Sequence, residues 1–130
     1  MSYILVVDDN FDNRHIIGQM LQFSGFTVEL VADAHSAIQI ARQRRPGLIL
    51  MDLSMPGLDG WTATEYVRRD PELHSIPVVA VSGHVTRNDI ERAKRAGCVE
   101  FLAKPIDYEH LIEVARRYTG QASRSSSHTS

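Results

Sequence analysis

The sequence lacks the features that would place it in a membrane or outside the cell. Its one cysteine, Cys98, cannot close a disulfide within the chain, which suits a reducing compartment. No apolar run approaches the roughly 20 residues that span a bilayer, and the opening MSYILVV has neither the basic segment nor the cleavage site of a secretory signal. We therefore expect a cytoplasmic protein without a membrane segment, and we interpret Cys98 as a small buried apolar residue.

An excess of charge of one sign is also absent. The net charge is -2, from 14 Lys and Arg against 16 Asp and Glu, so no overall positive field attracts nucleic acid. The basic cluster Arg42, Arg44 and Arg45 is explained more simply as the solvated end of a helix, where the dipole favours cations. With 130 residues, 43% hydrophobic and 23% charged, the chain fits one globular domain.

Short apolar segments alternate with stretches whose apolar residues recur at helical spacing. Strands that are apolar on both faces and alternate with helices predict a parallel sheet covered on each side, a (βα)5 doubly wound α/β domain. The predicted strands, rich in Val, Ile and Leu, are 3–7, 27–31, 48–51, 78–81 and 99–102. The helical patterns fall at 17–24, 34–41, 61–67, 90–97 and 111–118.

Capping residues support these limits. Asn10, Asp33 and Thr86 stand where helix N-caps belong, and Gly25 and Gly97 where helices end.

The C-terminal stretch differs from the rest. From residue 120 it reads GQASRSSSHTS, which offers almost nothing to bury. We expect a domain over 1–119 and a disordered Ser-rich tail over 120–130. The tail favours a complete protein over a fragment of a longer regulator or hybrid kinase.

Polar side chains interrupt the apolar pattern at the ends of the predicted strands. Asp8 and Asp9 follow the first strand, Asp52 ends the third, Ser82 follows the fourth and Lys104 follows the fifth. Parallel strands point their carboxyl ends to one edge, and ligands bind there where the strand order reverses. The five groups are therefore expected to converge on one pocket.

Three carboxylates in one pocket need a countercharge, because each pair repels by about 4 kcal/mol at 4 Å and an effective dielectric of 20. Lys104 supplies one positive charge, and a hard divalent cation with oxygen ligands, Mg²⁺, would supply the rest. An Asp side chain can attack phosphorus to form an aspartyl phosphate. Asp52 suits that role, Asp8 and Asp9 suit the metal, and Ser82 can donate to a phosphoryl oxygen.

Each of these residues also has a simpler interpretation. Asp8 and Asp9 could end a strand while Asn10 caps the next helix, Ser82 could belong to a turn, and a single Lys104 is most often a surface charge. These separate interpretations do not explain why all five groups occur together at the strand ends.

The strings VVDDN, LILMDLSMPGLDG, VVAVSG and FLAKP occur in order, each at the end of a predicted strand. Over residues 3–118 the chain resembles the receiver domain of two-component response regulators, such as the single-domain chemotaxis regulator. The resemblance implies a flavodoxin-like sheet with strand order 2-1-3-4-5 and a phosphorylation site at its edge. It implies a signalling protein that catalyses only its own phosphorylation and dephosphorylation.

The resemblance also assigns roles to the residues that match the family's pattern. Asp52 matches the phosphoacceptor, Asp9 a direct Mg²⁺ ligand, Asp8 a ligand mostly through water, and Lys104 the lysine that pairs with phosphoryl oxygens. The backbone carbonyl of Ser54 matches the position that completes the metal site.

Further positions match the family's switch. Ser82 matches the hydroxyl that follows the phosphoryl group, and Phe101 the aromatic residue that reorients with it. Ser54 and His84 occupy the two variable positions that tune the lifetime of the phosphoryl group. The Lys104–Pro105 bond matches one that is cis in the family.

The implied partners are proteins. The phosphodonor is a sensor histidine kinase or a histidine phosphotransfer protein, whose helices would dock on the first helix, and a downstream protein target would bind the surface of the fourth helix, fifth strand and fifth helix. We expect a monomer or weak dimer with no direct contact to nucleic acid. The residues expected on the docking face of the first helix are Phe11, Arg14, His15, Gly18 and Gln22.

Three rival functions use similar residues. A phosphatase of the haloacid dehalogenase type needs an acid two residues after its nucleophile, whereas Asp8 is followed by Asp9 and Asn10. A nucleotide- or flavin-binding domain needs a glycine-rich loop after the first strand, where the two aspartates would repel a pyrophosphate. A pseudo-receiver, acting only as an interaction module, would not need the complete set of five groups.

Overall fold

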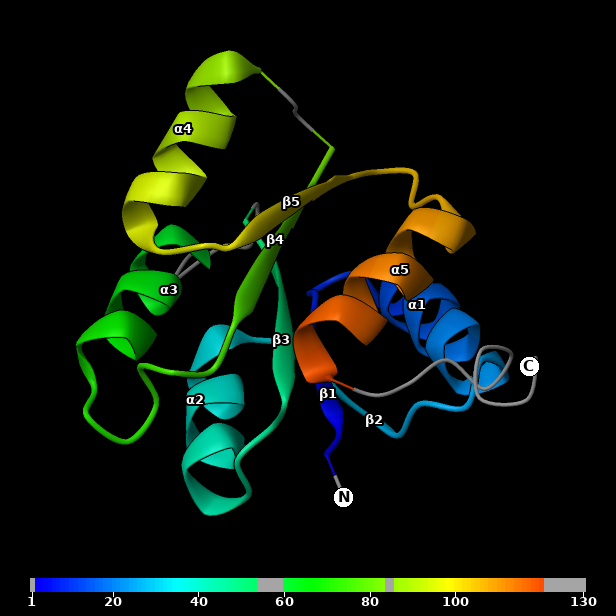
Figure 1. Cartoon of the computed structure of the whole chain (residues 1–130), viewed down its shortest axis with the longest axis horizontal. Helices are drawn as coiled ribbons and strands as arrows, with labels where there is room; N and C mark the ends of the chain where they lie inside the picture. Colours follow the sequence, from blue (N-terminus) through cyan, green and yellow to red (C-terminus); the bar gives the residue numbers. More distant parts are fainter. Residues whose placement is uncertain (1, 54–59, 84–85, 121–130) are drawn as a thin grey trace.

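The structure is a computed structural model that describes residues 2–53, 60–83 and 86–120. Within them, strands and helices alternate along the chain (Figure 1). The strands are β1 (Ile4–Val7), β2 (Val28–Val31), β3 (Leu48–Asp52), β4 (Val78–Ser82) and β5 (Glu100–Ala103). The helices are α1 (Phe11–Phe23), α2 (Ala34–Gln43), α3 (Gly60–Arg69), α4 (Arg87–Ala96) and α5 (Tyr108–Thr119).

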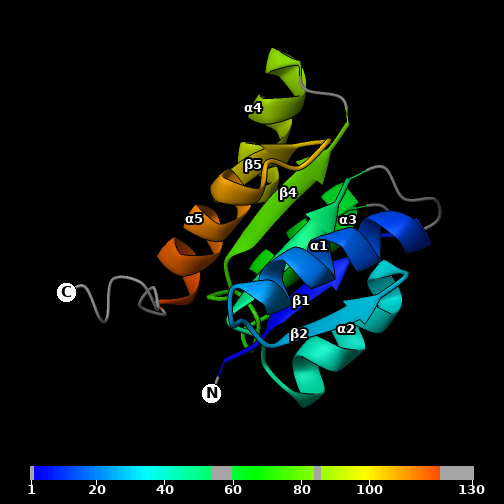
Figure 2. The same ribbon diagram turned by 90° about the vertical axis from the view of Figure 1, so that its right-hand side faces the viewer.

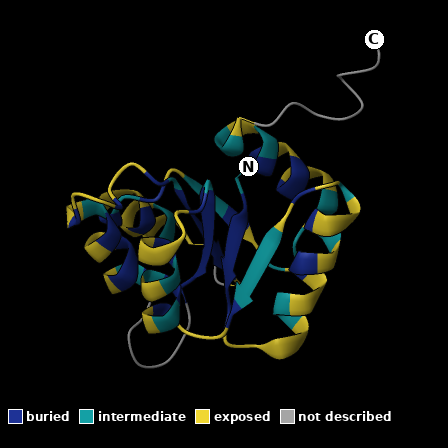
Figure 3. Ribbon diagram, turned by 90° about the horizontal axis from the view of Figure 1, so that it is seen from below, coloured by how far each residue is buried: buried dark blue, intermediate teal, exposed yellow. Residues whose placement is uncertain are grey.

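The five strands form one parallel sheet in the order β2-β1-β3-β4-β5, which confirms the predicted doubly wound, flavodoxin-like fold. The order reverses at β1 and β3, so this pair of strands forms the switch point of the sheet. β1, β3 and β4 are buried along their whole length, as the dark ribbons at the centre of Figure 3 show. Their nearly continuous Val, Ile and Leu content reflects burial on both faces.

Helices cover both faces of the sheet. α1 and α5 pack on one face, while α2, α3 and α4 cover the other (Figures 1 and 2). Each face has its own apolar core: Ile17, Leu21 and Leu111 lie in one, and Leu5, Met51 and Val67 in the other. Among the described residues, no helix combines the length and the apolar composition that a bilayer crossing requires.

Local signals set the helix ends largely as predicted. Asn10, Asp33 and Thr86 are N-caps, and each accepts a hydrogen bond from the backbone N–H three residues later. Gly25 follows the C-cap of α1 with φ 95°. Asp107, a cap that was not predicted, begins α5 by accepting from the His110 N–H at 3.0 Å.

Gly97 ends α4 in a left-handed conformation and allows a close contact with α3. Its φ is 112°, and a Cβ at this position would lie 2.3 Å from Cγ of Arg68. The Arg68 guanidinium donates to the backbone carbonyls of His74 and Ile76, so this side chain joins α3 to the segment before β4. The adjacent Cys98 is buried, as predicted.

Candidate functional site

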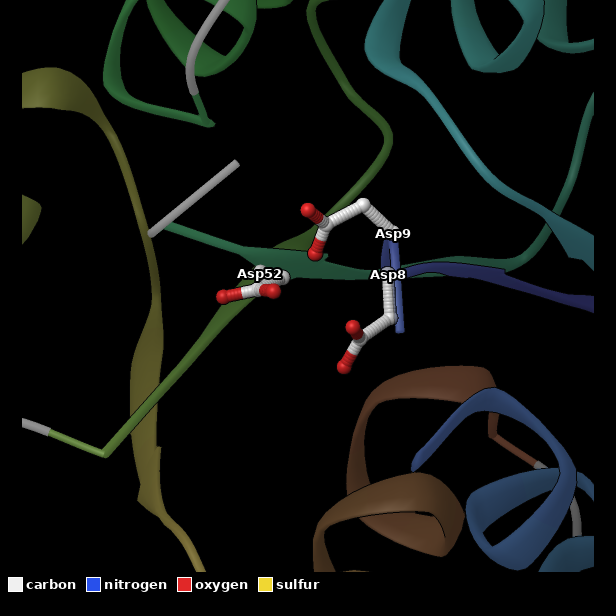
Figure 4. Close-up of side chains that lie close together, drawn as sticks. All are labelled: Asp8, Asp9 and Asp52. Carbon is white, nitrogen blue, oxygen red and sulfur yellow. The ribbon is translucent and has the colours of Figure 1, made fainter. Parts of the chain in front are cut away.

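Three aspartates meet at the carboxyl edge of the sheet, at the switch point (Figure 4). Val7 of β1 pairs with Met51 of β3, so the next residues, Asp8 and Asp52, lie side by side. One carboxylate oxygen from each of Asp8, Asp9 and Asp52 lies within 4.8 Å of the others. Asp8 and Asp52 are 1% and 2% exposed, whereas Asp9 is exposed. The predicted convergence of the three carboxylates is therefore confirmed.

Hydrogen bonds fix the turn between β1 and α1. Oδ1 of Asp8 accepts from the Asn10 N–H at 2.9 Å, and Oδ1 of Asn10 accepts from the Asn13 N–H at 2.9 Å. Nη1 of Arg14 donates to the backbone carbonyl of Asp8 at 2.9 Å. Asn10 is therefore a helix cap, as the simpler interpretation holds, and the carboxylates of Asp8 and Asp9 still lie close to that of Asp52 (Figure 4).

Lys104 supplies a positive charge to the cluster from the end of β5. Its Nζ lies 3.1 Å from Oδ2 of Asp8 and 3.4 Å from Oδ2 of Asp52, and its backbone N–H donates to the Ser82 carbonyl at 2.9 Å. Burial acts to lower the pKa of Lys104, but the contact with Asp8 and the charges of both aspartates outweigh it and raise the pKa. The Lys104–Pro105 peptide bond is cis, as predicted.

The residues present fit a hard divalent cation. Oδ2 of Asp8 is buried, and among the described residues it meets Lys104 as an ion pair without the geometry of a hydrogen bond. A buried carboxylate oxygen without a hydrogen-bond partner is costly, and a metal ion would satisfy it. Three carboxylates around one point form an oxygen-only ligand set. The site can therefore hold a metal ion.

The residues assigned to the switch lie on the two neighbouring strands. Ser82 is the last residue of β4 and is buried, with Ala103 of β5 as its partner in register. Phe101 of β5 is half-buried and packs against the core beneath α2, α3 and α4. Ser54 and His84, predicted as the metal-site carbonyl and the tuning positions, lie outside the described residues.

The predicted docking face of α1 needs one correction. Phe11 is 61% exposed, and its ring contacts that of His15 in a tilted arrangement with a centroid distance of 4.0 Å. Gln22 is exposed. Gly18, in contrast, is buried, and a Cβ there would lie 3.1 Å from Cδ2 of Leu30. Gly18 faces β2, so it does not belong to an exposed docking face.

A groove beside Lys104 was not predicted. It has a volume of about 180 Å³ and runs between α1 and the segment after β5. The sequence offered one signal, since Ile16 and Met20 share a helix face by their i, i+4 spacing, but Ile106 is remote in sequence. Ile16 is 48% exposed. The residues that line the groove are Asn13, Ile16, Ile17, Met20, Lys104, Pro105 and Ile106.

The fold and the site together define a class: doubly wound α/β proteins with an acidic cluster and a lysine at the switch point. The chain belongs to the response regulator receiver domain family, whose model matches residues 4–116, and is a receiver domain of two-component signalling. The Polar-differentiation response regulator DivK of Brucella anthropi is 34% identical over 119 residues, which are 92% of this chain and 97% of that protein.

Solved structures agree with this assignment. The receiver domain of the sensor histidine kinase PA1611 from Pseudomonas aeruginosa PAO1, a structure with magnesium coordinated in the active-site cleft, is 35% identical with a TM-score of 0.84. It covers 92% of this chain and 98% of its own. The chemotaxis protein CheY4 of Vibrio cholerae is 27% identical with a TM-score of 0.85, over 91% of this chain and 98% of that one.

Proposed function

We propose that Asp52 accepts a phosphoryl group from a phosphohistidine, and that the chain is the phosphoacceptor of a two-component phosphorelay. One observation supports this most strongly: the buried Asp52 carboxylate lies 3.4 Å from Lys104 and within 4.8 Å of two further carboxylates. In this arrangement Asp52 could act as the nucleophile, Lys104 as the cation and the three carboxylates as oxygen ligands, all within a few ångströms of one another. Transfer of a phosphoryl group needs mainly positioning and neutralisation of charge, which these groups provide.

The transfer exchanges one bond to phosphorus for another. A carboxylate oxygen of Asp52 attacks the phosphorus, an O–P bond forms, and the P–N bond to the donor histidine breaks with its electron pair returning to the imidazole. Lys104, now paired with Asp8 and Asp52, is placed to pair with a phosphoryl oxygen instead. The chain thus catalyses only its own phosphorylation and, with water as nucleophile, its own dephosphorylation.

Mg²⁺ is the cofactor that we propose for the cluster. Asp8, Asp9 and Asp52 would hold it, together with the backbone carbonyl of Ser54, which lies outside the described residues. The bound ion would offset the charge of the carboxylates and of the incoming phosphoryl oxygens. The magnesium ion in the PA1611 receiver domain supports this choice.

The phosphodonor, a sensor histidine kinase or histidine phosphotransfer protein, would dock on α1. The groove beside Lys104 places the apolar side chains of Ile16, Met20 and Ile106 next to the site, where a donor's helices must approach to deliver a phosphohistidine. Phe11, Arg14, His15 and Gln22 lie on another side of α1, and we propose them as further contacts of the donor. We place these events in the cytoplasm, which suits the free thiol of Cys98, and expect a monomer or weak dimer.

Phosphorylation would be read by a downstream protein. The Ser82 hydroxyl would donate to a phosphoryl oxygen, and Phe101 on the adjacent strand would follow it, which changes the surface of α4, β5 and α5. Ser82 and Phe101 are suited to this because they lie on neighbouring strands, one at the site and the other half-buried toward the surface.

The test compares Asp52→Asn with a matched control, Asp33→Asn. Asn replaces Asp well as an N-cap, so the control removes one carboxylate without removing the cap of α2. With a ³²P-labelled phosphotransfer protein and Mg²⁺, wild type and Asp33→Asn should become labelled and Asp52→Asn should not. Equal labelling of Asp52→Asn would refute the assignment.

A further inference from the structure

Arg14 is a half-buried cation in the second turn of α1 whose side chain reaches back to the acidic turn. Its Nη1 donates to the backbone carbonyl of Asp8 at 2.9 Å, and its guanidinium lies 5.5 Å from the centroid of the Phe11 ring. Its own N–H continues the helix by donating to the Asn10 carbonyl at 3.0 Å. Arg14 therefore links the body of α1 to the peptide group that joins Asp8 and Asp9.

That peptide group determines how the two aspartates lie relative to each other. The atoms from Cα of Asp8 to Cα of Asp9 lie in one plane, so fixing the carbonyl oxygen of Asp8 limits the rotation of this plane. Asp8 has other anchors, since its N–H donates to the Val31 carbonyl at 3.2 Å and its Oδ1 accepts from Asn10. Asp9 is exposed and depends on its backbone for its position.

We propose that Arg14 is a positioning residue for the metal site, because its bond to the Asp8 carbonyl orients the Asp8–Asp9 peptide and holds Asp9 toward Asp8 and Asp52. The proposal rests on the proposed function, since it assumes that Mg²⁺ binds these aspartates. It goes beyond the docking role assigned to Arg14 from the sequence. Groups that orient metal ligands typically change metal affinity 10- to 100-fold when they are removed.

Because Arg14 is charged, the direction in which its removal changes the Mg²⁺ affinity distinguishes two effects. A cation at the edge of the pocket repels Mg²⁺, so if charge alone mattered, its removal would tighten binding. Loss of the bond to the Asp8 carbonyl would instead loosen the turn and weaken binding. Arg14→Met removes both the hydrogen-bond donor and the charge. Arg14→Lys keeps the charge and N–H donors on a single ammonium nitrogen.

The experiment measures the Kd of Mg²⁺ by calorimetry, with the Tm in EDTA as a separate readout. Arg95→Met is the control: Arg95 is exposed in the last turn of α4, which precedes β5 and so lies away from the carboxyl edge of the sheet. We expect the Kd of Arg14→Met to rise at least about tenfold, that of Arg14→Lys to rise less, and Arg95→Met to match wild type. In EDTA, Arg14→Met loses its bond to the Asp8 carbonyl and should have a somewhat lower Tm than Arg95→Met. It should still unfold in one cooperative transition above the temperature of the calorimetry, so that a higher Kd reports the metal site and not loss of the fold.

An unchanged or lower Kd in Arg14→Met would overturn the inference. If that variant does not fold, Arg14→Gln replaces it, with the same expectation and the same refuting result. If wild type itself shows no saturable Mg²⁺ binding, the proposed function fails. If wild type and Arg14→Met bind Mg²⁺ equally well, only the positioning role of Arg14 fails.

Discussion

Removing the charge of Asp9 should stabilise the protein in the absence of metal. Among the described residues, Lys104 forms ion pairs with Asp8 and Asp52 but not with Asp9, whose carboxylate faces the other two within 4.8 Å. At such separations each pair repels by about 1 kcal/mol in a water-like dielectric and by about 4 kcal/mol at an effective dielectric of 20. Asp9 is exposed, so the lower value applies to each of its two pairs.

Asp9→Asn should therefore raise the free energy of unfolding in EDTA by about 2 kcal/mol, which corresponds to roughly 8 °C in Tm for a domain of this size. Mg²⁺ at 100 times the wild-type Kd should cancel most of this gain, because it stabilises wild type by about 2.7 kcal/mol while the variant, which lacks one ligand, is stabilised less. Urea denaturation with EDTA or Mg²⁺ measures both effects.

The control is Glu91→Gln, which removes an exposed carboxylate from α4 and should change stability little in either condition. A less stable Asp9→Asn in EDTA, or a gain that Mg²⁺ leaves untouched, would refute the argument that carboxylate repulsion opposes folding at this site.

Three further predictions concern groups around the site and the α3–α4 contact. The pKa of Lys104 is raised, so its ion pairs stabilise the fold fully below the unfolded-state pKa of about 10.4 and lose this effect as pH rises through the folded value. Urea titrations should show that Lys104→Met lowers the free energy of unfolding by about 2 kcal/mol at pH 8 and by less at pH 11, and an equal loss at both pH values would contradict this. Burial raises the pKa of Cys98 to about 11. A thiol reagent at pH 8 should therefore label native protein at least about a hundredfold more slowly than unfolded protein, and rapid labelling of native protein would show that the segment around Cys98 opens. Gly97→Ala should lower the free energy of unfolding by about 2 kcal/mol more than Gly120→Ala. Both glycines have positive φ, but only at Gly97 would a Cβ lie against Arg68, so equal losses in chemical denaturation would exclude the packing effect.

The fold and the convergence of the carboxylates were predictable because their signals are local. Each central strand is a continuous apolar run that ends in a polar residue, and the switch-point rule then brings Asp8 and Asp52 together from residues more than 40 positions apart. The strand ends were less accurate. Ser82 pairs within β4 instead of following it, and Asp52, which was expected to end the third strand, pairs within β3 one residue beyond the predicted range 48–51, since backbone pairing continues past the last apolar residue.

Features that depend on contacts between residues far apart in the sequence could not be predicted from it. Gly18 is buried because Leu30 of β2 covers it, although its position on α1 suggested an exposed face. The groove beside Lys104 forms only when Ile16 and Ile106, ninety residues apart, come together. The bond from Arg14 to the Asp8 carbonyl likewise depends on how α1 leaves the sheet, which the sequence pattern does not specify.

The most direct test of the central claim identifies the phosphorylated residue. The protein is incubated with acetyl phosphate and Mg²⁺, and borohydride then reduces any acyl phosphate to the corresponding alcohol, which converts an aspartyl phosphate into homoserine. Peptide mass spectrometry should find homoserine at position 52, and at no position when EDTA replaces Mg²⁺. Homoserine at another aspartate, or none at position 52 in folded, Mg²⁺-loaded protein, would contradict the account.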